Sequence, residues 1–140
     1  MNITLKIAII VIITWLFTEV IKIILEAKKT KKINWKTLFK YGGMPSAHSS
    51  FVTSLATTIF LAEGFTTTFI IAVAIAILII RDLLVIRTSI DRNAHNIEKT
   101  TSKIKTIPTI KAKTIMHTKI EMLIGSLIGI IGSYFLWLII

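Results

Sequence analysis

Four apolar runs dominate the chain, and segments rich in lysine and arginine separate them. About 20 predominantly apolar residues are needed to cross the hydrocarbon core of a bilayer. The runs therefore predict membrane-spanning helices at residues 3–25, 46–62, 67–86 and 119–140. The run at 46–62 is short and rich in serine and threonine, so we expect it either inside the bundle or only slightly tilted, with its first turn at the interface. The pattern predicts an all-α membrane bundle of about four transmembrane helices.

The polar segment 89–113 carries a weaker helical pattern. Its apolar residues recur near helical spacing at Ile90, Ala94, Ile97 and Ile104, which predicts an amphipathic helix on the cytoplasmic surface of the membrane. His95 falls on the polar side of this pattern and is expected to be exposed to solvent. No internal repeat and no linker rich in glycine, serine or proline divides the chain, so we expect one domain over residues 1–140.

Composition agrees with the membrane assignment and restricts the chemistry. Hydrophobic residues make up 54% of the 140 residues, well above the usage of a soluble domain. The absence of cysteine excludes disulfides and thiolate metal sites. With a net charge of +10, the chain could bind either of two classes of anionic partner, nucleic acid or anionic lipid. The location of the cations decides between them.

The cations flank the apolar runs. Residues 28–40 hold six lysines and residues 87–119 hold eight lysines or arginines, together 14 of the 17 in the chain. By the positive-inside rule, both segments are expected to face the cytoplasm and both chain ends the outside. Lysines in such positions need no partner beyond anionic lipid and the insertion machinery. We therefore expect a multi-pass protein of the cell membrane that does not bind nucleic acid.

Residues that could take part in catalysis or ligand binding gather at the cytoplasmic ends of the expected spans. They lie in "GGMPSAHS" (42–49), "RDLLVIR" (81–87) and "HTKIE" (117–121). In a helix bundle such ends can converge. The first turn at 46–62 would offer backbone N–H groups and the Ser46 hydroxyl to an anion, and we count Gly43 with this phosphate-binding group.

Each cluster also has a purely structural explanation. Ser46 could be only a helix N-cap. Glu121 lies three residues after Thr118 and could complete a capping box. Gly125 and Gly129 have the spacing of a close contact between membrane helices. None of these explanations accounts for a histidine beside the cap.

Two groups of charged residues near or within the apolar runs could likewise be either structural or functional. Arg81, Asp82 and Arg87 could be interfacial charges, because arginine near a helix end reaches the headgroups cheaply. Glu19 and Lys22 lie three residues apart in a run that is otherwise almost wholly apolar. Charges inside a membrane indicate a functional site by default, although mutual pairing would also explain these two.

Spacing connects the residues of the last run. Residues four apart share one face of a helix, so His117, Glu121, Gly125 and Gly129 form one line. A carboxylate that holds an imidazole fixes its tautomer and leaves the second ring nitrogen as a nucleophile or base. Two histidines, one acid, several cations and a helix N-terminus together indicate a phosphoryl-transfer centre.

These segments resemble a known family. "GGMPSAHSSFVTSLATTIFLAEGF", "RDLLVIR" and "HTKIEMLIGSLIG" are similar to the divergent branch of the type 2 phosphatidic acid phosphatase superfamily, which is related to the vanadium-dependent haloperoxidases. The resemblance extends from about Glu19 to Gly132. Pro45, Ser46 and His48 match its P-S-G-H element, with alanine for glycine. His117 and Glu121 match its histidine and acid, with glutamate for aspartate.

The resemblance implies a metal-free phosphatase, without a cofactor, that forms a phosphohistidine. His117 would attack phosphorus, Glu121 would hold its ring, and His48 would serve first as acid and then as base. The charge on the phosphate oxygens would be stabilised by Ser46, Arg87 and Lys111, with Lys22 and Arg81 as further candidates. Lys111 stands where the family pattern has arginine, and Val85 and Thr88 are further departures. Asp82 matches the branch and is expected only to pair with a cation.

We therefore expect a lipid phosphate phosphatase of the cytoplasmic leaflet. Phosphatidate, phosphatidylglycerophosphate and isoprenyl phosphates are all candidate substrates, and a homo-oligomer is a possible assembly. The alternative is a non-catalytic membrane scaffold or lipid-binding protein with the same fold. A third class, a small transporter or channel subunit, would use Glu19, Arg81 and Asp82 as its pathway.

Overall fold

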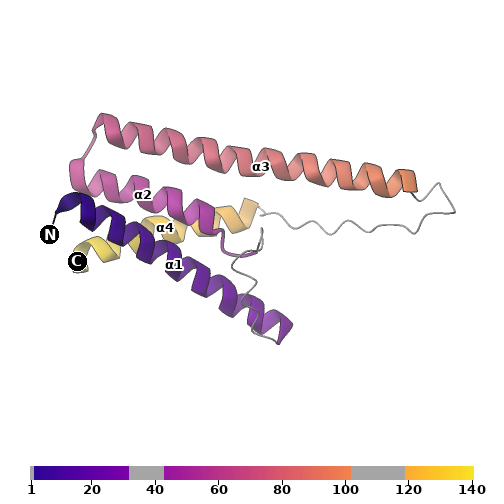
Figure 1. The fold of residues 1–140 in the computed structure, drawn as a ribbon, viewed down its shortest axis with the longest axis horizontal. Helices are drawn as coiled ribbons and strands as arrows, with labels where there is room; N and C mark the ends of the chain where they lie inside the picture. The colour runs from indigo at the N-terminus through magenta and orange to yellow at the C-terminus, as the bar shows by residue number, and fades with distance from the viewer. Residues whose placement is uncertain (1, 32–42, 102–118) are drawn as a thin grey trace.

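The computed structural model describes residues 2–31, 43–101 and 119–140, and these form four helices. In chain order they are α1 (Ile3–Thr30), α2 (Ala47–Glu63), α3 (Thr67–Thr101) and α4 (Lys119–Ile139). The described residues contain no strand. The prediction of an all-α membrane bundle is confirmed (Figure 1).

The helices place the two chain ends together. Figure 1 shows the start of α1, the end of α4 and the turn between α2 and α3 at one end of the bundle. The starts of α2 and α4 lie together further along the bundle. Helices α2 and α4 therefore run parallel to each other, and α1 and α3 run antiparallel to them.

Helix α2 occupies the centre of the bundle and contacts each of the other three helices. Its buried face consists largely of small hydroxyl residues, as the sequence predicted for the shortest run: Ser49, Ser50, Ser54 and Thr58. The Thr58 hydroxyl donates to the carbonyl of Ser54 at 2.6 Å. The Thr18 hydroxyl of α1 meets that of Ser50 at 2.7 Å. Hydrogen bonds of this kind let polar side chains enter an apolar bundle without leaving a donor unsatisfied.

Glycines bring α4 close to α2. A Cβ atom on Gly125 would collide with the backbone carbonyl of Ser46, and one on Gly129 would collide with Ser50 and Thr53. The sequence predicted a helix contact from the spacing of these glycines, and the structure confirms it and identifies α2 as the partner. Gly132 faces α1 instead, where its Cβ would lie 3.3 Å from the Thr14 methyl group.

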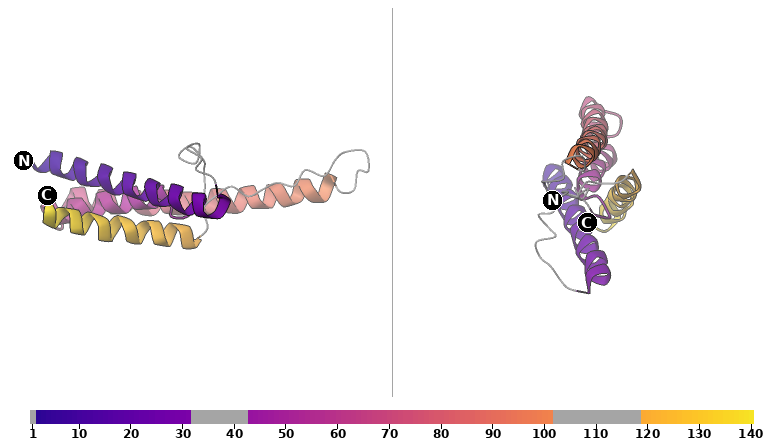
Figure 2. Two further views of the ribbon diagram at one scale, coloured as in Figure 1. Left: turned by 90° about the horizontal axis from the view of Figure 1, so that it is seen from below. Right: turned by 90° about the vertical axis from the view of Figure 1, so that its right-hand side faces the viewer.

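A tight turn joins α2 to α3. Gly64 ends α2 with a positive φ of 72°, and its N–H donates to the Phe60 carbonyl at 2.8 Å. Phe60, Phe65 and Phe69 cluster around the turn with ring centroids 5.1 to 5.3 Å apart. Helix α3 packs mainly against α2, and the end-on view in Figure 2 shows it to one side of α1, α2 and α4.

The long helix α3 differs from the sequence-based division. Residues 89–101 continue α3 as one helix, whereas we expected a separate amphipathic helix over 89–113. The remainder of that segment, residues 102–113, lies outside the described residues. Within the described ranges, three helices are long and apolar enough to cross a membrane: α1, α3 over Thr67–Ile97, and α4. Helix α2 has 17 residues and is enclosed by its neighbours.

Candidate functional site

Ser46 caps the start of α2. Its φ and ψ are extended, and its side-chain oxygen accepts from the N–H of Ser49 at 3.4 Å and from the Ser49 hydroxyl at 3.2 Å. The expected N-cap is therefore present. In both contacts the Ser46 oxygen is the acceptor, so its own O–H hydrogen is left to donate elsewhere. Ser46 is fully buried.

Helix α4 begins directly against this cap. The backbone N–H of Ser46 donates to the backbone carbonyl of Glu121 at 3.0 Å. One turn later, Gly125 rests on the backbone of Ser46. Glu121 itself lies in the first turn of α4 and is half-buried. The backbone contact fixes Glu121 beside the "PSAH" element, although Glu121 lies far from that element in the sequence.

Helix α1 brings a buried ion pair to the same place. The Nζ of Lys22 lies 3.5 Å from the Oε2 of Glu19, and the two side chains are only 5% and 8% exposed. A Cβ on Gly43 would lie 3.4 Å from Cε of Lys22, so the lysine side chain runs past this glycine. Gly43 has a φ of 99°, a conformation that disfavours any other residue. The backbone conformation therefore selects glycine here, whereas the contact with Lys22 would be an ordinary van der Waals contact.

The contact between α2 and α3 shows which residue of α3 lies at the same position along the bundle axis as His48. Phe60 and Phe69 face each other with ring centroids 5.1 Å apart, and both helices rise by about 1.5 Å per residue. Twelve residues from this pair, α2 reaches His48 and α3 reaches Arg81. His48 is exposed and shares a helical face with Val52.

Arg81 and Asp82 thus lie at the depth of the cap without being packed into it. Both side chains are exposed. The expected pairing of Asp82 with a cation stays a prediction. The structure describes the backbone of Arg87 as part of α3, while its side chain lies outside what is described.

These elements can hold an anion. The first-turn N–H groups of a helix have no partner within the helix, and the macrodipole places positive charge at that end. Here the N-termini of two parallel helices, α2 and α4, lie side by side. The Lys22 side chain passes Gly43, three residues before Ser46. Among the described residues, no group of three His, Asp or Glu side chains is arranged to hold a metal ion.

Two expected members of the site cannot be placed. His117 and Lys111, like Gly42 and Thr118, lie outside the described residues. The proposed pairing of His117 with Glu121 and the capping box from Thr118 to Glu121 therefore stay predictions. The structure brings together Lys22, Gly43, Ser46 and Glu121, and places His48 one turn or less away along α2.

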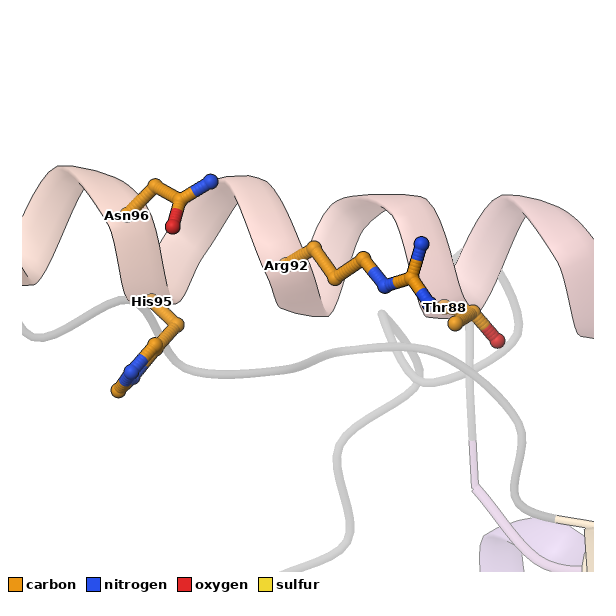
Figure 3. Close-up of a pocket in the computed structure, with 4 residues that line it drawn as sticks. All are labelled: Thr88, Arg92, His95 and Asn96. Carbon is orange, nitrogen blue, oxygen red and sulfur yellow. The ribbon is translucent and has the colours of Figure 1, made fainter.

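A second concave region lies on α3 beyond the start of α2. Figure 3 shows Thr88, Arg92, His95 and Asn96, which line it along successive turns of that one helix. His95 is exposed, as the sequence predicted. All the described residues that line the region belong to α3. We do not count them as part of the site.

Comparison with known proteins agrees with this arrangement. Residues 3–132 match the family described as the Divergent PAP2 family. The chain belongs to the divergent PAP2 family. It is also 27% identical over 132 residues to the uncharacterized membrane protein YuiD of Bacillus subtilis (strain 168), with 83% of this chain and 84% of that protein covered. No solved structure matches the chain significantly.

In this member of the divergent PAP2 family, sequence reasoning underestimated α1. Thr14, Thr18 and Lys22 recur every four residues in an apolar span, and all three are buried against the other helices. That spacing marks one polar face of a membrane helix, directed inward. This spacing could have identified Lys22 as a stronger candidate for the phosphate site than the other cations.

Proposed function

We propose that this protein is a metal-independent phosphatase that removes phosphate from a membrane lipid phosphate through a phosphohistidine intermediate. Membership of the divergent PAP2 family supports the general chemistry. The observation that carries the proposal is the convergence of three elements on Ser46. The backbone carbonyl of Glu121 in α4 accepts a hydrogen bond from the backbone N–H of Ser46, and Gly125 packs on the Ser46 backbone. The Lys22 side chain of α1 passes the nearby Gly43.

The charged headgroup would bind where two helix N-termini and Lys22 meet. The N–H groups of the first turn of α2 and the Ser46 hydroxyl are donors suited to phosphate oxygens. Lys22 would supply positive charge to the phosphate, since its side chain passes Gly43. Arg81 and Arg87 would approach from α3, and Lys111 stays a further candidate.

The first chemical step would transfer the phosphoryl group to the protein. A ring nitrogen of His117 attacks phosphorus, and the bond between phosphorus and the lipid oxygen breaks. His48 gives a proton to that oxygen, so the lipid leaves as an alcohol. Glu121 accepts a hydrogen bond from the other ring nitrogen of His117, which stabilises the charge on the ring.

The second step would release inorganic phosphate. Neutral His48 removes a proton from water, and the resulting hydroxide attacks phosphorus. The bond to the His117 nitrogen breaks, and both histidines return to their starting protonation states. Because the site lies at the end of the bundle opposite the chain termini, the positive-inside rule directs it to the cytoplasmic leaflet.

Phosphate release by the purified protein tests this function. We expect release from at least one of phosphatidate, phosphatidylglycerophosphate or an isoprenyl phosphate, with EDTA present, and inhibition by vanadate. Activity that EDTA abolishes and Mg²⁺ restores would refute the metal-independent mechanism. A folded wild-type protein that releases no phosphate from any of them would favour the scaffold or lipid-binding alternative.

A further inference from the structure

One buried carboxylate oxygen of α1 has no hydrogen-bond donor in the described part of the chain. Glu19 is 6% exposed, and the atom concerned is its Oε2. The Nζ of Lys22 lies 3.5 Å away, which makes an ion pair but not a hydrogen bond. Buried polar atoms are almost always hydrogen-bonded, because an acceptor without a donor costs free energy. The phosphohistidine mechanism gives Glu19 no role, so this oxygen needs another explanation.

The contact between α1 and α2 places this carboxylate beside the candidate anion site. The hydroxyls of Thr18 and Ser50 meet at 2.7 Å, and the two helices run antiparallel (Figure 1). Four residues from this contact, α1 reaches Lys22 and α2 reaches Ser46. Both residues therefore lie about 6 Å further toward the same end of the bundle. Glu19 lies between the two levels, within one turn of the cap.

The side chain of Lys22 connects Glu19 with the residues that precede the cap. A Cβ atom on Gly43 would lie 3.4 Å from Cε of Lys22, the carbon that carries the ammonium. The ammonium is therefore close both to the Glu19 carboxylate and to the backbone of Gly43. A phosphate oxygen that accepts a hydrogen bond of about 2.8 Å from this ammonium lies no more than about 6 Å from Oε2. A second oxygen of the same phosphate can then reach Oε2 itself.

Only an oxygen that carries a hydrogen suits this position. An ionised carboxylate is purely an acceptor, and so is a fully ionised oxyanion, so the two repel each other. Glu121 adds a second carboxylate beside the cap, while His48 and Arg81 lie at this depth with exposed side chains. A P–OH group instead donates a strong, charge-assisted hydrogen bond to Oε2. The hydrogen arrives on the ligand, and no bond to phosphorus changes.

We propose that Glu19 binds the phosphate directly, by accepting a hydrogen bond from a P–OH group, so that the site selects oxyanions that carry a hydrogen. The inference rests on the proposed function, because it places phosphate at Ser46 and Lys22, and it specifies the protonation state of the ligand. A phosphate monoester, whose second pKa is about 6, binds as its monoanion, and inorganic phosphate binds as hydrogen phosphate. Sulfate has the same shape but no hydrogen near neutral pH, and is rejected.

Binding of inorganic oxyanions to the purified protein tests this selection without requiring turnover. Isothermal titration calorimetry, near neutral pH and at constant ionic strength, compares two pairs of tetrahedral anions: phosphate with sulfate, and vanadate with tungstate. The first anion of each pair carries a hydrogen at this pH and the second does not. We expect the wild-type protein to bind phosphate and vanadate at least tenfold more tightly than sulfate and tungstate.

Matched variants separate the hydrogen bond from a general effect of charge. Glu19→Gln introduces an amide that can donate to a fully ionised oxygen, so we expect the preference for phosphate over sulfate to fall at least tenfold. Glu26→Gln is the control, because it removes a half-buried carboxylate one turn beyond Lys22 on the same helix. Loss of a nearby negative charge strengthens the binding of all anions alike, so this control should keep the preference. Glu19→Asn carries the shorter amide and replaces Glu19→Gln if that variant does not fold.

The outcomes distinguish this inference from the proposed function. Selective binding of phosphate that depends on Glu19, without phosphate release from any lipid, would reject only the phosphatase. Phosphate release by a protein that binds phosphate and sulfate equally would overturn the role of Glu19 and leave the phosphatase standing. A preference that survives in Glu19→Gln, or that falls equally in Glu26→Gln, would assign the selection to another group and overturn the inference. Failure of all four anions to bind would overturn it as well.

Discussion

The backbone N–H of Ser46 donates to the backbone carbonyl of Glu121 at 3.0 Å, which joins the N-terminal ends of two parallel helices. The bond connects the element "PSAH" with the acid that the family pattern places beside its nucleophile. Parallel helices direct their positive ends to the same side of the membrane, so their N-terminal dipoles reinforce each other. Antiparallel packing of α2 and α4 would have placed the two motifs at opposite ends.

Gly125 permits this contact, and enlarging it should separate the two ends. A Cβ at this position would collide with the Ser46 carbonyl. We predict that Gly125→Ala lowers the free energy of unfolding by about 1–3 kcal/mol, the usual cost of overpacking, and reduces phosphate release. Thermal unfolding in detergent and an activity assay measure the two effects. Gly132→Ala is the control, because its Cβ would meet only the Thr14 side chain, at 3.3 Å. Equal stability of both variants would show that α2 and α4 are not closely packed.

The pair Glu19 and Lys22 should have separable structural and chemical roles. Lys22→Met leaves a buried carboxylate without its ion-pair partner and should cost about 3–5 kcal/mol of stability. The double variant Glu19→Gln, Lys22→Met removes both charges and should regain most of the unfolding temperature of the wild type. If Lys22 also binds phosphate, the double variant should remain at least tenfold less active. A stable and fully active double variant would limit Lys22 to a structural role.

The membrane orientation can be tested by cysteine labelling, since the chain contains no cysteine of its own. Cysteine introduced at Lys32 or Lys103 should be protected from an impermeant thiol reagent in intact cells, because the basic segments are expected inside. Cysteine at Gly64, in the turn near the chain ends, should react. Labelling at positions 32 and 103 but not at 64 would invert the orientation and place the site outside.

His48 should matter most when the leaving group is poor. His48→Ala removes the side chain that we propose as the acid for the lipid oxygen, but leaves His117 in place. We predict a large loss of turnover with lipid phosphates, and partial rescue of the first step with p-nitrophenyl phosphate, whose leaving group needs little protonation. Breakdown of the intermediate should stay slow, because the base is also missing. The burst and steady-state phases of nitrophenol release measure the two steps separately. An equal loss with both substrates would argue against His48 as the acid.

The sequence predicted the parts of this fold that depend on local pattern. The apolar runs locate all four helices, and the hydroxyl residues of the second run identify the buried helix, because a bundle interior can satisfy them and lipid cannot. Ser46 as N-cap and the glycine line also followed from spacing. These features need no knowledge of the partner helix.

Features that depend on packing could not be predicted in the same way. The proximity of Lys22 to Gly43 arises from how α1 crosses the start of α2. The continuation of α3 through residue 101 was missed because the fall in hydropathy near Arg81 marks an exit from the apolar run, and a helix needs no apolar residues to continue. The direction of α4 relative to α2 depends on Gly125 meeting Ser46 rather than another residue.

Trapping the phosphoenzyme tests the central claim most directly. The protein is mixed with a lipid phosphate carrying radiolabelled phosphate, quenched in base, and examined for label on the protein. We predict label that is stable in base and labile in acid, absent from His117→Ala, and accumulated in His48→Ala. Glu121→Gln should form it more slowly by orders of magnitude while remaining folded, since the amide cannot stabilise the charged ring. Normal turnover in folded His117→Ala and Glu121→Gln proteins would contradict the phosphohistidine mechanism.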